Sequence, residues 1–103
     1  MIIDVSVLPV CPASFEDLQS LIGLEIGPTG WFGVTQERIN AFADATEDHQ
    51  WIHVDTERAA ASPLGTTIAH GLYSLALGPA FTSQLISFAG FASAYPPVFP
   101  RSV

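Results

Sequence analysis

The stretch IAHGLYSLALGPAFTSQLISFAGF, Ile68–Phe91, decides the fold because it is mostly apolar and no charge occurs between Arg58 and Arg101. Its length would allow a membrane crossing. However, glycine, proline, serine and threonine residues interrupt it, and no adjacent Lys or Arg would give a transmembrane helix its orientation. We therefore expect a buried core helix that opens at Thr66 or Thr67, is kinked or split at Gly78-Pro79, and adds an oligomer contact.

The composition indicates a small domain that associates with itself. The 103 residues are enough for one small domain. Hydrophobic residues make up 49% and charged residues only 13%, against a usual charged fraction of about 25%. This balance excludes disorder. It also leaves few charges to cover a surface, so we predict a homodimer or higher homo-oligomer.

The charge balance limits the classes of molecule that the chain is expected to bind. Ten acidic residues face three arginines and no lysine, giving a net charge of −7. This predicts no nucleic-acid partner, since phosphate binding depends on Lys and Arg, and it favours cations. Cys11 is the only cysteine, so no disulfide forms within the chain. Together with an N-terminus that does not resemble a signal peptide, this predicts a cytoplasmic protein.

The order of helix signals predicts one domain in three parts. Residues 1–13 read as an extended arm, 14–89 as a helical region and 90–103 as an irregular Pro-rich tail. Residues 31–34 are compatible with a short strand, and 47–54 read as a polar-aromatic loop. Three residues fit helix N-caps because acids follow in the first turn: Ser14, Thr35 and Asp55.

Candidate catalytic residues gather in one part of the chain. All three histidines and half of the acids lie between Asp44 and His70. Asp48 and His53, five residues apart across a loop, are placed to hold a water molecule and transfer protons. The alternative is structural: Asp48 caps a helix, and His53 is a hydrogen-bonded loop residue.

A metal site is a second interpretation of the same cluster. If the stretch from His49 to His53 is helical, the i, i+4 spacing puts both rings on one face. Asp48, Glu47 or His70 would add ligands, and the set suits a divalent ion such as Zn or Mn. A metal-bound water would then hydrolyse esters, lactones or phosphotriesters. His70 also fits a core histidine.

Two segments resemble a known family. Residues 42–59, FADATEDHQWIHVDTERA, and residues 67–71, TIAHG, are similar to the MaoC-like dehydratases, the (R)-specific enoyl-CoA hydratases. The resemblance implies a hot-dog fold, in which an antiparallel sheet wraps a long helix, usually in a dimer. It implies that Asp48 and His53 act on a water that adds across an enoyl thioester, without a cofactor. The Gly71 N–H would polarise the thioester carbonyl.

The chain departs from the family pattern at three places. Gln50, which we expect to orient the substrate, stands where an Asn that orients the Asp is common, and Trp51 stands where Pro is common. Residues 90–103 do not resemble the family's continuation, whose strands complete the sheet. We therefore predict a C-terminally truncated, mainly α remnant of a hot dog, with helices packed in an intertwined homo-oligomer. The alternatives are an α+β hot dog completed between subunits, and a non-catalytic, self-associating helical remnant.

Overall fold

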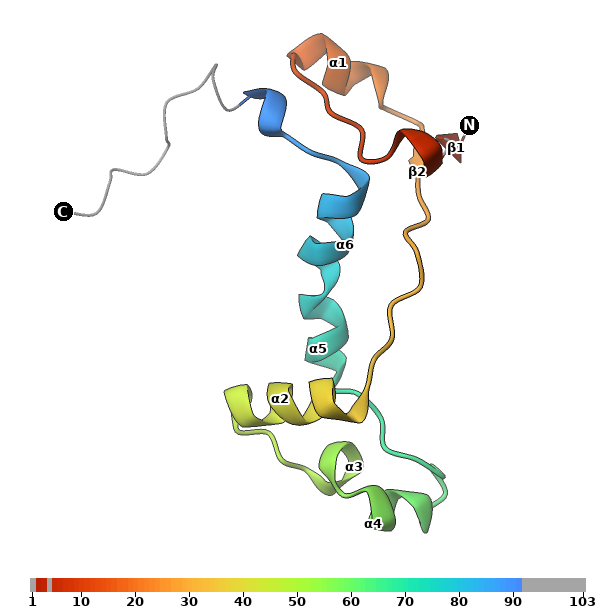
Figure 1. Cartoon of the computed structure of the whole chain (residues 1–103), viewed down its shortest axis with the longest axis vertical. Helices are drawn as coiled ribbons and strands as arrows, with labels where there is room; N and C mark the ends of the chain where they lie inside the picture. Colours follow the sequence, from red (N-terminus) through yellow and green to blue (C-terminus); the bar gives the residue numbers. More distant parts are fainter. Residues whose placement is uncertain (1, 4, 92–103) are drawn as a thin grey trace, which may run out of the picture. The chain divides into compact units, whose positions relative to one another are not determined.

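A computed structural model of the chain describes residues 2, 3 and 5–91 (Figure 1). These residues gather into two compact units. One spans residues 31–78, and the other combines the segment up to residue 30 with the segment from residue 79 onward. Among the described residues, no helix has both the length and the apolarity needed to cross a membrane. The predicted single-domain boundaries stay a prediction.

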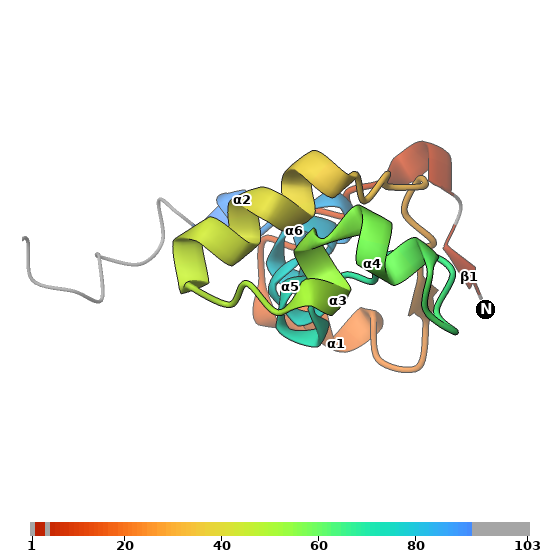
Figure 2. The ribbon, with the colours of Figure 1, turned by 90° about the horizontal axis from the view of Figure 1, so that it is seen from below.

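The unit of residues 31–78 is helical. It contains α2 (Gln36–Thr46), α3 (Trp51–Val54), α4 (Thr56–Ala60) and α5 (Gly71–Ala76). The short helix α3 packs against both α2 and α4 (Figures 1 and 2). The buried residues of this unit come from all four helices and the residue before α5: Ile39, Ala43, His53, Ala59, His70 and Tyr73. Two of these six are histidines, so a third of this small core is polar.

Local capping explains where two of these helices begin. The Thr35 hydroxyl accepts a hydrogen bond from the Arg38 N–H at 3.2 Å, at the N-terminus of α2. The Asp55 carboxylate accepts one from the Arg58 N–H at 3.0 Å, at the N-terminus of α4. Each cap satisfies a first-turn donor that has no partner inside its helix. Both predicted caps are confirmed.

The other unit holds short elements. Strand β1 (Ile2–Ile3) pairs in parallel with β2 (Glu25–Ile26), and a parallel bridge joins Val10 to Ile86. The helices are α1 (Phe15–Ser20) and α6 (Gly78–Leu85), with 3-10 turns η1 at Val5–Val7 and η2 at Ala89–Phe91. The Ser14 hydroxyl accepts from the Asp17 N–H at 3.1 Å, which confirms the third predicted cap.

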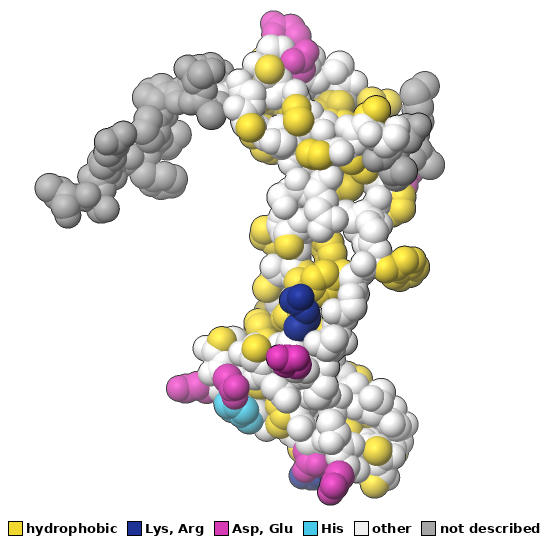
Figure 3. Space-filling view, in the orientation of Figure 1, with side chains coloured by type: hydrophobic (Ala, Val, Ile, Leu, Met, Phe, Trp, Pro, Cys, Tyr) yellow, Lys and Arg dark blue, Asp and Glu magenta, His cyan; other side chains and the backbone are white. Residues whose placement is uncertain are grey.

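The prediction of one long apolar helix over residues 68–91 is wrong in two respects. Its first helix, α5, begins at Gly71 rather than at Thr66 or Thr67, because residues 66–70 are not helical and the Ile68 N–H donates to the Ile52 carbonyl at 3.0 Å instead. It is also not buried. Leu72 and Leu75 are 70% and 73% exposed, and Figure 3 shows uncovered hydrophobic side chains over α5. The predicted split at Gly78-Pro79 is confirmed, since α5 ends at Ala76 and α6 begins at Gly78.

Two smaller expectations also need correction. No strand forms at residues 31–34. Trp31 is fully exposed there, so burial of its side chain does not stabilise a paired strand. The predicted loop 47–54 contains the helix α3 in its second half. The mainly α class holds for the described residues, whose strands are only two residues long. Most of the predicted tail, residues 92–103, lies outside the described residues.

Candidate active site

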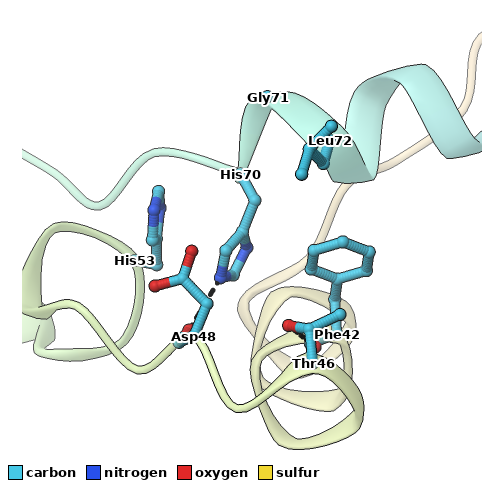
Figure 4. Close-up of a pocket in the computed structure, with 7 residues that line it drawn as sticks. All are labelled: Phe42, Thr46, Asp48, His53, His70, Gly71 and Leu72. Carbon is cyan, nitrogen blue, oxygen red and sulfur yellow. Dashed lines mark hydrogen bonds between the residues drawn. The ribbon is translucent and has the colours of Figure 1, made fainter.

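One pocket in the unit of residues 31–78 is lined by Asp48 and two of the three histidines. Its volume is about 260 Å³, and Figure 4 shows the residues that line it. They come from α2, the loop after it, α3 and the start of α5: Phe42, Thr46, Asp48, His53, His70, Gly71 and Leu72. The sequence placed Asp48, His53 and Gly71 in one site, and the structure brings all three to this pocket.

His53 is held so that one ring nitrogen is left for chemistry. The ring is buried, and its Nδ1 lies 2.7 Å from the Ile68 carbonyl oxygen. A carbonyl only accepts, so Nδ1 must carry the hydrogen and donate it. In the neutral ring, Nε2 then keeps its lone pair. This is the form in which a histidine can take a proton from a water molecule.

Gln36 fixes the backbone around His53. Its amide nitrogen donates to the His53 carbonyl at 2.7 Å and to Asn40 Oδ1 at 2.9 Å. Its amide oxygen accepts a short hydrogen bond from the Thr67 hydroxyl. One side chain on α2 thus ties α3 to the non-helical segment 66–70, whose Ile68 carbonyl holds the His53 ring.

Asp48 reaches the pocket through a sharp turn. Glu47, the residue that ends α2, has a φ of +63°, in the left-handed region. The chain turns there, and in Figure 4 the Asp48 side chain points toward the imidazoles of His53 and His70. Asp48 Oδ1 accepts from the Gln50 N–H at 3.4 Å. Of Asp48, His53 and His70, Asp48 is the most exposed.

The structure shows the surroundings of the two residues, Gln50 and Trp51, that depart from the family motif. Gln50 touches Asp48 through its backbone N–H, and its exposed side chain makes no cap hydrogen bond. Trp51 is the first residue of α3, a position that tolerates proline because its N–H has no partner within the helix. A tryptophan there keeps the helix start and adds a contact, since the Arg58 guanidinium lies 4.3 Å from its ring centroid.

His70 connects the two sides of the pocket. It is 3% exposed, and its Nε2 donates to the Asp48 carbonyl at 3.0 Å. Its ring stacks on the His53 ring, with centroids 3.8 Å apart and planes inclined by 23°. The centroid of the Phe42 ring lies 4.8 Å from the centroid of the His70 ring. His70 Nδ1 is buried and has no hydrogen-bond partner among the residues that the structure describes.

Gly71 begins α5 at the edge of the pocket. An N–H in the first turn of a helix has no acceptor within that helix and is left for another oxygen. A Cβ added to Gly71 would meet no atom within 4 Å, and its φ is not in the left-handed region. Packing and backbone strain therefore do not explain a glycine here.

The ligand set predicted for a metal is only partly assembled. One atom each from Asp48, His53 and His70 lies within 4.8 Å of the others. His49 does not join this cluster: its Nε2 lies 2.8 Å from Asp44 Oδ1, and both side chains are largely exposed. Glu47 is exposed at the turn. The His49–His53 pair fails to form on one helix face because α3 begins only at Trp51.

Sequence reasoning missed two residues of this arrangement, Gln36 and Phe42. Gln36 meets its partners 17 and 31 residues away, so no local spacing could reveal it. Phe42 is the first residue of the family-like segment 42–59 and lies on the apolar face of its helix, and an apolar face predicts burial rather than a pocket wall. For His70, the sequence indicates only a metal ligand or a core residue.

Comparison with known proteins gives a family match over most of the chain. Residues 17–100 match the family described as the MaoC-like domain. The 3-hydroxyacyl-thioester dehydratase Z proteins of Mycobacterium tuberculosis and Mycobacterium bovis are 54% identical over 77 residues, covering 75% of this chain and 51% of theirs. Nodulation protein N of Rhizobium meliloti is 57% identical over 65 residues, covering 62% of this chain and 40% of its own. The chain spans about half the length of the curated relatives it matches.

Proposed function

Because the chain belongs to the MaoC-like dehydratase family, we propose that it hydrates an enoyl thioester, such as an enoyl-CoA, and catalyses the reverse dehydration of the 3-hydroxyacyl thioester. The observation that carries this proposal is the pocket in which the Asp48 carboxylate faces His53, whose Nε2 lone pair is left free by the Nδ1 hydrogen bond. The name of the mycobacterial relatives supports the same substrate class.

The geometry supports the following roles for Asp48 and His53 in the hydration reaction. Asp48 and His53 together hold one water molecule and accept one of its protons. The water oxygen bonds to the β-carbon of the enoyl group, and the electron pair of the double bond moves toward the thioester carbonyl. A proton from the acid–base pair then reaches the α-carbon, so the pair ends as it began. This chemistry requires no cofactor.

Gly71 fits the role of the donor to the carbonyl. Negative charge develops on the thioester oxygen while the water adds, and a backbone N–H held at that position stabilises it. Gly71 lines the pocket and contributes a first-turn N–H of α5. The open space around its α-carbon leaves room for the thioester to approach.

The acid–base pair is tested with a matched control pair in the same chain. Asp48→Asn and His53→Gln should each lower kcat for hydration of crotonyl-CoA by about 100-fold or more, since positioned proton transfer contributes about 10²–10⁴-fold. Asp44→Asn and His49→Gln alter another Asp–His pair, which lies outside the pocket on the surface. They should leave kcat within about twofold. Loss of enoyl absorbance measures the rate.

An equal rate for wild type and Asp48→Asn would contradict the proposal. So would a loss in the control pair as large as the loss in the pocket pair, since solvent-exposed residues would then matter as much. Circular dichroism of each variant separates loss of chemistry from loss of fold.

The role of Gly71 has its own test. Gly71→Ala adds a methyl group that meets no atom of the chain, so thermal stability should be unchanged or slightly higher. The methyl enters the space that the thioester would occupy, and kcat/KM should fall about tenfold or more. Gly78→Ala is the control, because it also begins a helix, also meets nothing within 4 Å and lies outside the pocket. Full activity in Gly71→Ala would remove Gly71 from the site.

A metal-dependent hydrolase of esters, lactones or phosphotriesters is a second candidate, favoured by the close approach of Asp48, His53 and His70. An ion bound at His70 Nε2 would replace the hydrogen that this nitrogen donates to the Asp48 carbonyl. Under this function, purified chain contains near-stoichiometric Zn or Mn, and chelation abolishes hydrolysis. His49→Gln has no effect on the metal content, whereas His53→Gln removes the metal. Hydrolysis that survives exhaustive chelation rejects this candidate.

A further inference from the structure

We propose that His70 is the positioning residue of the site: it holds the Asp48 backbone with one ring edge and the His53 ring with one face. The inference rests on the proposed function for its kinetic consequences, and on geometry alone for the contacts. His70 itself touches neither the water nor the thioester in this role.

The first observation is a hydrogen bond that crosses the pocket. His70 Nε2–H donates to the Asp48 carbonyl at 3.0 Å, joining residues 22 positions apart in the sequence. Asp48 lies in the loop between α2 and α3, directly after a left-handed residue. A loop position is held by such long-range contacts rather than by a helix ladder. The hydrogen bond therefore fixes the position of the Asp48 backbone, from which the Asp48 side chain extends.

The second observation is the stacked pair of rings. His53 and His70 stack with centroids 3.8 Å apart, so rotation of the His53 ring would drive it into His70. The opposite constraint comes from the Ile68 carbonyl, which holds His53 Nδ1 at 2.7 Å. The two contacts fix both the tilt of the His53 ring and the direction of its free Nε2.

The third observation is the cost of an imidazole at this place. His70 is 3% exposed and leaves Nδ1 buried without a partner among the described residues. A buried polar atom without a hydrogen bond costs about 1–3 kcal/mol. A phenylalanine would fill the same space against Phe42 and His53 without that cost. A purely structural core position does not call for histidine, whereas a tether to the Asp48 carbonyl needs a donor.

The two hydrogen bonds thereby require a hydrogen on opposite nitrogens of the two rings. The Ile68 carbonyl demands a hydrogen on His53 Nδ1, and the Asp48 carbonyl demands one on His70 Nε2. The tautomer of each ring is measurable by the nitrogen-15 shifts of the imidazole in solution NMR. This readout does not depend on any enzymatic activity.

The kinetic test uses three substitutions of His70. Glutamine presents an amide N–H near the place of Nε2, asparagine presents one nearer to Nδ1, and phenylalanine keeps the ring without a donor. We expect His70→Gln to retain kcat within about fivefold. His70→Asn and His70→Phe should lower kcat about 10- to 100-fold with KM changed less than about threefold, because misplacement by about 1 Å costs up to about 10²-fold.

A double-mutant cycle with Asp48 separates positioning from general damage. If His70 acts through Asp48, His70→Phe should cause no further loss of kcat in an Asp48→Asn chain. Multiplicative losses would overturn the proposal, as would wild-type kcat in His70→Phe. So would a loss of kcat in His70→Phe that is matched by unfolding at the assay temperature.

The NMR measurement distinguishes failure of this inference from failure of the proposed function. A folded wild-type chain with the hydrogen on His70 Nδ1 overturns the tether, whatever its activity. A chain with both predicted tautomers, in which His70→Phe shifts the amide signals of residues 48–50 while His70→Gln restores them, supports the positioning role. If that same chain hydrates no thioester, the proposed function fails and the geometric role stands.

Discussion

Among the residues that the structure describes, Glu47 is the one non-glycine residue with a positive φ. With a φ of +63° it ends α2 in the left-handed region, where a Cβ is crowded. Glycine is the usual residue at this place after a helix. The conformation is nevertheless required, because it turns the chain so that Asp48 faces the pocket.

Glu47→Gly should therefore stabilise the chain. We expect the free energy of unfolding to rise by about 0.5–1 kcal/mol, the relief of left-handed strain exceeding the added entropy of the unfolded state. Urea unfolding followed by circular dichroism measures it. Glu47→Ala removes the charge and keeps the Cβ, so it should give no gain. Equal stabilisation by both variants would assign the effect to charge.

Single residues also show what the sequence could reveal about the site. The resemblance singles out Asp48, His53 and Gly71, and the structure brings these three residues to one pocket. Gln50 contacts Asp48 through its backbone N–H, a detail that residue types do not encode, and the orienting role of its side chain stays a prediction. The donor role of His70 depends on where the Asp48 carbonyl points, which only the folded loop determines.

At the scale of elements, helix starts separate into those set locally and those set by tertiary contacts. Ser14, Thr35 and Asp55 each bond the N–H three residues ahead, so the sequence alone predicted all three caps. The start of α5 depends instead on the hydrogen bond between Ile68 and Ile52, sixteen residues apart in the chain. Apolar periodicity does not reveal this long-range bond, so it does not predict that residues 66–70 stay outside the helix.

The cap of α2 is a stability test at this scale. Thr35→Ala removes the acceptor for the Arg38 N–H and should lower the free energy of unfolding by about 1 kcal/mol. Thr35→Ser keeps the hydroxyl and should lower it by much less. Thermal or urea unfolding of the two variants provides the comparison. An equal loss in both would show that the Thr35 methyl group, rather than the hydrogen bond, supports the helix.

At the scale of the whole molecule, exposed hydrophobic side chains stand out on the surface of the described residues. Ten large hydrophobic side chains are exposed among the described residues, and Ile68, Leu72 and Leu75 lie close together in the sequence at the start of α5. Burying an exposed leucine side chain contributes about 1.5–3 kcal/mol. This arrangement supports the oligomer predicted from composition, which remains a proposal.

Self-association should depend on Leu75, which is 73% exposed and does not line the pocket. We expect wild-type chain to sediment as a dimer or larger assembly, and Leu75→Glu to shift it toward the monomer because a charge cannot be buried cheaply. Ser74→Glu adds the same charge at the neighbouring exposed position and should leave the assembly intact. A wild-type chain that is monomeric at all concentrations would contradict the prediction.

The Gln36 side chain has a consequence for how the native chain opens. It bonds the His53 carbonyl and the Thr67 hydroxyl at once, so α2, α3 and the segment before α5 cannot separate one at a time without breaking it. Amide hydrogens of these pieces should therefore exchange with solvent through one cooperative event. In native-state exchange, the His53 and Ile68 N–H groups should report the same opening free energy, and Gln36→Leu should let them diverge.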